Sequence, residues 1–206
     1  MVPTNSTITR RAAIAGMAAL AACSSKSAVP RTTSSKATQL LAAARKQIGV
    51  TLAYDPGYTR IPYPGGDVVR SRGVCTDVVI RAYRDAFGVD LQALVHTDMA
   101  SAFKAYPQKW SLPGPDSNID HRRVPNLATF FHRQRAELPI PSSSSDWQAG
   151  DIFVAHLLNG ATHTGLISDK TSSLGRPLVI HNWGSGTQEE SAWTWLLPYG
   201  RFRFLL

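Results

Sequence analysis

Cysteines, long apolar runs and dense runs of charge are all scarce in this sequence of 206 residues. The apolar segment at residues 12–22 is too short to cross a membrane as a helix. The net charge of +8 is spread along the chain and no nucleic-acid-binding motif accompanies it, so we expect no nucleic-acid partner. The charge instead suits a surface near an anionic polymer, such as a cell wall, or near anionic lipid.

The N-terminal segment has the pattern of a bacterial export signal. Arg10 and Arg11 precede the apolar run, which ends in Leu20-Ala21-Ala22-Cys23. Small residues before a cysteine resemble a lipobox, in which Cys23 becomes the lipidated first residue of the mature protein. An ordinary cleaved signal or a disordered apolar leader is the alternative. We therefore expect an exported lipoprotein, anchored by its lipid to a membrane of the cell envelope, and leave open whether export uses the twin-arginine route.

Changes in composition along the chain predict three segments. Residues 1–22 are the expected signal peptide. Residues 23–36 begin with the lipidated cysteine and continue as small polar residues without apolar periodicity, which predicts a flexible tether. Residues 37–206 are long enough for one domain with its own core. If Cys23 carries lipid, Cys75 has no partner in the chain for an internal disulfide.

Helical patterns come first in this domain and β-rich runs come last. Apolar periodicity predicts helices over about residues 37–49, 75–87 and 91–110, and from about 124 onward. The β-rich runs lie at about residues 146–158, 161–169, 176–184 and 199–206. Asn159-Gly160, between the first two runs, is a strong hairpin signal. The order predicts an α+β domain with N-terminal helices packed on a mainly antiparallel sheet.

Cys75 is the only cysteine of the domain and stands at the start of the amphipathic helix predicted over 75–87. Unpaired backbone N–H groups and the helix dipole stabilise an anion there, which predicts a lowered thiol pKa and a nucleophilic thiolate. One alternative is that Cys75 is a small buried hydrophobe. Another is a zinc site, but no short Cys-x-x-Cys or His-x-x-x-His pair supplies the usual ligand spacing, so we expect neither metal nor cofactor.

Two of the six histidines are placed to assist such a thiol. Alternation in the run at 161–169 puts His163 and Gly165 on one face, where the glycine leaves room for a substrate or another side chain. A histidine on a sheet facing a cysteine at a helix N-terminus is the arrangement of papain-like thiol hydrolases. His181, on the next predicted strand, is the expected third member that orients His163, in preference to its neighbour Asn182.

These residues occur in an order similar to that of the NlpC-type cell-wall peptidases. Tyr63, Gly65-Gly66, Cys75, Gly150-Asp151 and His163 follow one another as the tyrosine, glycine pair, cysteine, Gly-Asp strand and histidine do there. The strings GVCTDVVIRAYR, DLQALVHTDM, NIDHRRVPNL, HTGLISD and VIHNWG more closely resemble the bacterial family catalogued as domain of unknown function 1287, which is placed near those peptidases.

The resemblance implies a papain-like fold, a catalytic triad of Cys75, His163 and His181, and Tyr63 near the oxyanion site. The sequence departs from the NlpC pattern in two ways. Val-Cys-Thr-Asp replaces the usual Asp-Cys-Ser-Gly around the nucleophile, and a long helical insertion separates the cysteine from the histidine. The substrate therefore does not carry over from that family.

Other polar and aromatic residues are candidates for binding a substrate. The run from Asp120 to Arg123 is denser in charge than a loop requires, and its arginines could bind a substrate carboxylate. Trp183 stands beside His181 and could wall the cleft. The candidate substrate-binding residues are Asp120, His121, Arg122, Arg123 and Trp183. For Asp77, in the first turn of the helix, we favour a structural role at the positive end of the dipole.

Together these patterns predict a monomeric, exported cysteine hydrolase that cleaves amide bonds as a peptidase or amidase. Its expected partner is peptidoglycan, through the amides of its peptide part, or another amide substrate of the cell envelope. The lipid on Cys23 would hold it at the membrane. The main alternative is a non-catalytic cell-wall-binding lipoprotein that retains a degenerate fold.

Overall fold

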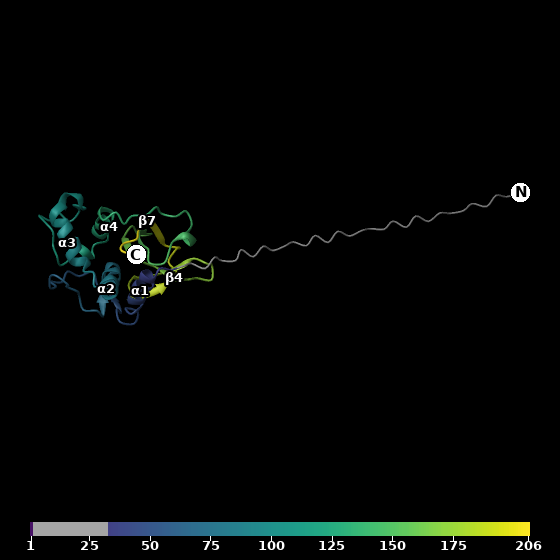
Figure 1. Ribbon diagram of the computed structural model, residues 1–206, viewed down its shortest axis with the longest axis horizontal. Helices are drawn as coiled ribbons and strands as arrows, with labels where there is room; N and C mark the ends of the chain where they lie inside the picture. The colour runs from purple at the N-terminus through teal and green to yellow at the C-terminus, as the bar shows by residue number, and fades with distance from the viewer. Residues whose placement is uncertain (2–32) are drawn as a thin grey trace. The chain divides into compact units, whose positions relative to one another are not determined.

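The computed structural model describes residues 33–206 together with Met1 (Figure 1). The predicted signal peptide, the lipidation site Cys23 and most of the predicted tether lie outside the described residues. Among the described residues, no helix combines the length and apolarity needed to cross a membrane. The first helix begins at Ser35, two residues before the predicted domain start, because the Ser34 side chain caps it by accepting from the Ala37 N–H.

Four α-helices occupy the first part of the domain: α1 (Ser35–Arg45), α2 (Cys75–Phe87), α3 (Leu91–Ala102) and α4 (Val124–Arg133). The bounds of α2 confirm the prediction, and Gly88 ends it in the left-handed conformation at φ 67°. The prediction for α3 was too long. This helix ends at Ala102 and gives way to a 3-10 turn, and Pro107 could not have continued it. The other 3-10 turns are at Asp120–Arg122 and Ser144–Asp146.

The main sheet has five strands, all paired antiparallel, in the order β6-β5-β4-β3-β7. The strands are β3 (Ile152–Leu157), β4 (Thr162–Thr171), β5 (Pro177–Asn182), β6 (Thr187–Glu190) and β7 (Leu196–Phe202). The Asn159-Gly160 hairpin between β3 and β4 is confirmed. The sequence did not predict β6, and the last strand lies at Leu196–Phe202 instead of 199–206.

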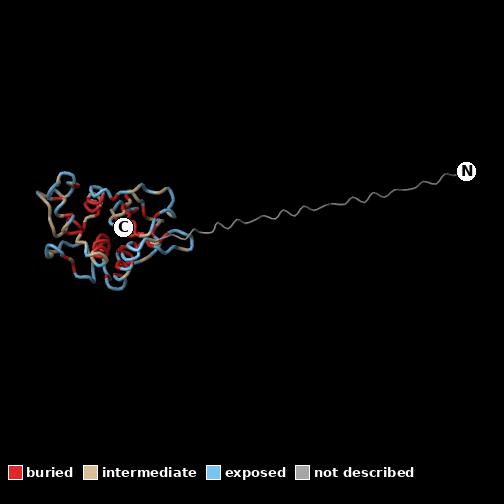
Figure 2. The backbone as a smooth tube through the Cα atoms, viewed as in Figure 1, coloured by how far each residue is buried: buried red, intermediate tan, exposed pale blue. Residues whose placement is uncertain are grey.

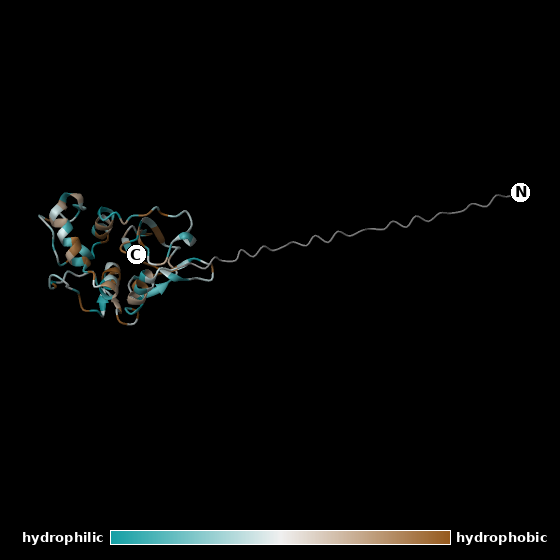
Figure 3. Cartoon of the chain, in the orientation of Figure 1, coloured by the Kyte–Doolittle hydropathy of each residue, from teal (hydrophilic) through white to brown (hydrophobic). Residues whose placement is uncertain are grey.

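Both faces of the sheet are covered. One face packs Val154, Leu166 and Ile180 against α2 and the other helices in the larger core cluster. The opposite face packs Phe153 and Val179 in a smaller cluster that includes Trp147. Buried residues therefore gather along α1, α2 and α4 (Figure 2), and these helices carry both hydrophilic and hydrophobic residues (Figure 3). Burying each aliphatic side chain of the two clusters fully contributes about 1.5–3 kcal/mol to the free energy of unfolding.

A separate two-stranded parallel sheet joins β1 (Ala53–Tyr54) to β2 (Arg72–Gly73), which leads directly into α2. The Asn182 side chain, at the end of β5, donates to the backbone oxygens of Gly73 and Ala53. The small sheet is therefore tied to the main sheet at the point where α2 begins. The observed architecture confirms the α+β class.

Candidate active site: a thiol beside a histidine row

Cys75 is the first residue of α2, and its side chain is buried, with only 2% of the residue exposed. Burial raises the pKa of its thiol to about 11, despite favourable contacts from the backbone N–H groups of Thr164 and Thr76 and from the Tyr54 hydroxyl. The predicted lowering of this pKa is therefore wrong, because desolvation outweighs the donors at the helix N-terminus. The thiol is protonated at neutral pH.

Two histidines and a carboxylate form a hydrogen-bonded row across three neighbouring strands. His163 on β4 lies with its Nε2 atom 2.8 Å from Nδ1 of His181 on β5. His181 Nε2 lies 3.1 Å from a carboxylate oxygen of Glu190 on β6. Gly165 permits this spacing, because a Cβ atom there would lie 2.9 Å from the His181 Cβ and 2.5 Å from the Ile180 oxygen.

The row determines where the protons lie. The Glu190 carboxylate accepts, so His181 carries its hydrogen on Nε2 and accepts at Nδ1 from His163 Nε2–H. This tautomer leaves a lone pair on His163 Nδ1, a buried atom with no hydrogen-bond partner in the structure. Burial, and then the neighbouring His181, lowers the pKa of His163 to about 3, so that the ring is neutral. His163 is thus a neutral base with one vacant acceptor.

The thiol and the histidine row meet at β4. Thr164, whose N–H contacts the Cys75 sulfur, directly follows His163 in the strand. In the part of the chain that the structure describes, Cys75 and His163 are not hydrogen-bonded to each other. Hydrogen bonds of a catalytic pair are often formed only in the complex with substrate. The structure thus brings together the elements that carry Cys75, His163 and His181.

Tryptophan side chains cover the histidines. Trp183, predicted to wall the cleft, is 44% exposed, and its ring centroid lies 5.5 Å from that of His163 in an edge arrangement. Trp195 packs on His181 at 5.5 Å between centroids. Both tryptophans and Glu190 line a cavity of about 410 Å³. These rings shield the hydrogen bond between the histidines from water.

A second cavity, also of about 410 Å³, contains the thiol. Its walls come from the segment around β1, from α2 and α4, from the loops between them, and from the first residue of β4. The lining residues are Tyr54, Pro56, Tyr58, Val74, Cys75, Lys109, Trp110, Ile119, Arg122, Arg123, Val124, Pro125 and Thr162. None of them is acidic.

Tyr54, and not Tyr63, is the tyrosine at the thiol. Its hydroxyl contacts Cys75, and burial raises its pKa. Tyr63 is 46% exposed, packs on His96 with 5.0 Å between ring centroids, and does not line the thiol cavity. The order of residues pointed to Tyr63, whereas Tyr54 reaches the site because β1 pairs with the strand that leads into α2. Sequence reasoning also missed Glu190, which lies on the unpredicted strand.

The four residues from Asp120 to Arg123 have different surroundings. Asp120 and His121 are buried and do not line the thiol cavity, so the structure does not support their assignment to substrate binding. Arg122 is buried in an ion pair with Asp77 at 3.0 Å. Arg123 alone combines a place in the cavity wall with partial exposure.

Asp77 has the predicted structural role. Its carboxylate accepts from the Val74 N–H at 2.7 Å and so caps the first turn of α2. It also pairs with Arg122, whose guanidinium donates to the backbone oxygens of Asp55 and Gly57. This pair fixes the loop after β1 against the helix that carries the thiol, because Arg122 binds both the loop backbone and Asp77 of that helix. Removing either member would leave the other as an uncompensated buried charge, which costs stability.

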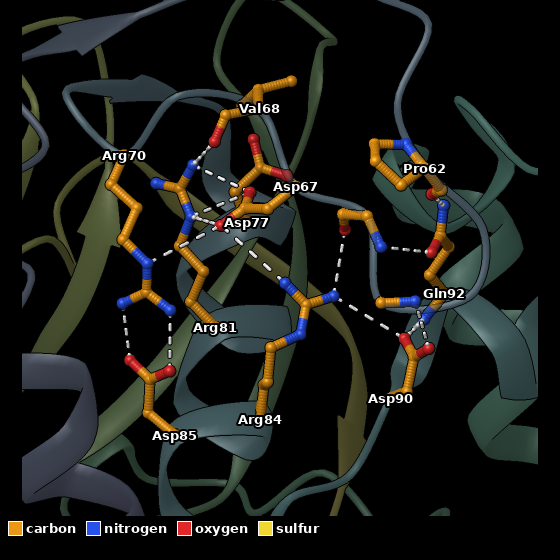
Figure 4. Close-up of polar contacts among 12 residues, drawn as sticks. Pro62, Asp67, Val68, Arg70, Asp77, Arg81, Arg84, Asp85, Asp90 and Gln92 are labelled. Carbon is orange, nitrogen blue, oxygen red and sulfur yellow. Dashed lines mark hydrogen bonds and ion pairs between the residues drawn. The ribbon is translucent and has the colours of Figure 1, made fainter.

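Basic side chains of α2 hold the loop that precedes the thiol (Figure 4). Arg81, almost fully buried, donates to the Asp67 carboxylate at 2.9 Å. Arg84 donates to the backbone oxygen of Gly66 at 3.0 Å, and the Gln92 side chain accepts from the Gly66 N–H at 2.7 Å. The helix therefore orders its own entry loop, which positions Cys75.

The described residues contain no group of three or more His, Cys, Asp or Glu side chains that could hold a metal ion. In the histidine row, Glu190 and His163 are both hydrogen-bonded to His181 itself. The side-chain nitrogen and oxygen atoms of the row therefore bond to one another and do not converge on a point where a metal ion could lie.

A family model described as domain of unknown function (DUF1287) matches residues 41–204. The chain belongs to this family. It is also 56% identical over 164 residues to the uncharacterized protein YijF of Escherichia coli (strain K12), a match that covers 79% of each chain. The expected membership in this family is confirmed. The matched range contains Tyr54, Cys75, both histidines of the row and Glu190.

Proposed function

We propose that this protein is a cysteine hydrolase of amide bonds with a papain-like, NlpC-type fold. The observation that carries the proposal is the row from His163 through His181 to Glu190, which leaves one unpartnered nitrogen on the strand that contacts the thiol. A structural histidine pair has no need of a vacant buried acceptor, because an unpaired buried polar atom costs stability. A base that awaits a proton does need one.

In the proposed reaction the resting pair is neutral. The Cys75 sulfur attacks the carbonyl carbon as its proton passes to His163 Nδ1. The Cys75 N–H and the Tyr54 hydroxyl bind the resulting oxyanion. His163 then gives the proton to the leaving amine, and a thioester remains on Cys75. Water attacks the thioester, loses a proton to His163, and the departing sulfur is reprotonated.

His181 and Glu190 act on the base and not on the substrate. His181 holds the tautomer of His163 and stabilises the imidazolium that forms during the attack. The Glu190 carboxylate opposes the effect of burial on His181, whose pKa is lowered by that burial. It therefore lowers the cost of placing a positive charge in the row.

We propose the peptide amides of peptidoglycan as the substrate, for a lipoprotein anchored at Cys23 in the cell envelope. The support is the leader pattern that ends in Leu20-Ala21-Ala22-Cys23 and the net charge of +8, which favours an anionic polymer. Substitution Cys23→Ser tests the anchor. The substituted protein should lose lipid labelling, and unchanged labelling and membrane retention would contradict the lipobox.

The test of the activity is digestion of purified peptidoglycan, with the released fragments identified by mass. The full-length protein should release peptide fragments, and Cys75→Ala should release none. A parallel sample with chelator should digest equally well, since a zinc enzyme would lose activity there. Firm binding to peptidoglycan without fragments would support the non-catalytic lipoprotein instead.

A further inference from the structure

The cavity that contains the thiol has a wall of one charge. Lys109, Arg122 and Arg123 line it, and no aspartate or glutamate does. The three cations are not equivalent. The Arg122 guanidinium is occupied by Asp77 and by the backbone oxygens of Asp55 and Gly57, so it serves the fold.

Arg123 and Lys109 are the cations available to a ligand. The only carboxylate that pairs with Arg123 in the described residues is Asp120, through a single contact of 3.3 Å. Lys109 is exposed and has no carboxylate within 4.0 Å in the same part of the chain. Burial lowers the pKa of Arg123, which reflects a charge that is removed from water without full compensation.

Trp110 holds these two cations together. The Arg123 Cζ atom lies 4.1 Å from the centroid of the Trp110 ring, and the Lys109 Nζ atom lies 5.1 Å from it. Both charges are thus held by the same indole. Two like charges near each other repel, and an anion placed between them converts this repulsion into two attractions. Arginine also binds a carboxylate with two parallel hydrogen bonds.

We propose that the substrate carries a free carboxylate on the part that enters the Cys75 cavity, where Arg123 and Lys109 bind it. This inference rests on the proposed function and names the class of amide: one with an acidic group within reach of the reacting bond. The volume of about 410 Å³ admits a group of the size of one or a few amino-acid residues. Asp120 positions Arg123 and does not touch the ligand.

The test is calorimetric binding to the full-length protein carrying Cys75→Ala, which binds without turnover. The probes are a soluble peptidoglycan peptide with free carboxylates and the same peptide with every carboxylate converted to an amide. The free peptide should bind at least about tenfold more tightly, since hydrogen bonds to charged groups are the stronger ones. Equal affinity for the two peptides would overturn the inference.

Substitutions locate the effect. Arg123→Gln should weaken binding of the free peptide about tenfold and leave binding of the amidated peptide unchanged, and Arg123→Lys should restore part of the loss. Lys109→Gln should give a smaller loss in the same direction, and as an exposed residue it can be changed without disturbing the core. Arg176→Gln, at an exposed turn outside the cavity, is the matched control and should change neither affinity. Loss of affinity for both peptides alike in Arg123→Gln would contradict carboxylate recognition.

The two proposals fail separately. If the wild-type protein releases no fragments but the Cys75→Ala protein still discriminates between the two peptides, the hydrolase is wrong and the anion site stands. If fragments are released and the two peptides bind equally, the hydrolase stands and the anion site is wrong.

Discussion

The two halves of the candidate site are built by different means. His163, His181 and Glu190 stand on three neighbouring strands, so the register of one sheet places them together. Apart from the contact with Thr164 of β4, the surroundings of Cys75 come from β1, α2, α4 and the loop before α4, and buried ion pairs such as Arg122 with Asp77 join them. The sheet fixes which nitrogen of His163 is the vacant acceptor, and the loops, with β4, determine what surrounds the thiol.

This difference predicts how each half responds to change. A residue of the row is tied to the hydrogen bonds of a sheet, so substitution there should alter proton transfer while the fold persists. A residue of the loop half binds backbone oxygens or contacts the thiol, so substitution there should alter the position of the thiol or the binding of the oxyanion.

The largest effect is expected where the two halves meet. Cys75→Ala and His163→Ala should each lower kcat by about 10³-fold or more, and the double substitution should cost little more than either alone, because residues that act as a unit are not additive. Steady-state kinetics of the three proteins measure this, with thermal unfolding as the control for folding. Full activity of His163→Ala would separate the two halves functionally and contradict the mechanism.

In the loop half, the two tyrosines form a matched pair. Tyr54→Phe removes a hydroxyl that contacts the thiol, and kcat should fall by about 10²- to 10³-fold, in keeping with the loss of an oxyanion donor. Tyr63→Phe changes a residue that is 46% exposed and whose ring packs on His96, and kcat should not change. The opposite result for the pair would return the oxyanion role to Tyr63.

In the sheet half, Glu190→Gln keeps the size of the side chain but removes the charge that stabilises a protonated row. We expect kcat to fall about tenfold, less than for His163→Ala, because Glu190 acts through His181 and transfers no proton itself. Glu137→Gln changes a second carboxylate that contacts a histidine, His132, on the surface of the described domain, and it should leave kcat unchanged. Equal effects of the two substitutions would mean that the row has no part in catalysis.

The smallest effect is expected for pH. The pKa of His163 is lowered to about 3 and that of Cys75 is raised to about 11, so the base is free above the first value and the thiol stays protonated below the second. The profile of kcat/KM should therefore be flat over roughly pH 5 to 9. Alkylation of Cys75 in the resting protein should be slow at neutral pH. A bell-shaped profile centred near neutrality, with fast alkylation, would indicate a preformed thiolate instead.

Much of the fold followed from the sequence, because its signals are local. The 3.6-residue periodicity and Gly88 bound α2, and Asn159-Gly160 located the hairpin. The strand β6 was missed because only its first residue, Thr187, is β-branched. The other three are polar, two of them glutamates, which are depleted in strands, and the strand pairs only with β5. The prediction for α3 was too long because apolar residues continue past its end.

The histidines of the site could be predicted from local sequence patterns, as the helices and the hairpin could. Alternation along two strands was enough to choose His163 and His181, which the structure brings into contact. The surroundings of the thiol were not predictable, because they depend on tertiary contacts. Burial of Cys75, and the approach of Tyr54 through the β1–β2 pair, leave no periodic mark in the sequence.

The edge position of β6 links the histidine row to local opening of the sheet. This strand has four residues and a neighbour on one side only, so its hydrogen bonds should exchange with solvent before those of β4. When the strand opens, Glu190 leaves His181, whose hydrogen is then free to move to its Nδ1 and be donated to His163 Nε2. His163 then carries its own hydrogen on Nδ1, where it blocks the acceptor. In the proposed reaction, fraying of this one short strand would therefore switch the base off while the rest of the domain stays folded, and a contact that clamps β6 would hold it on.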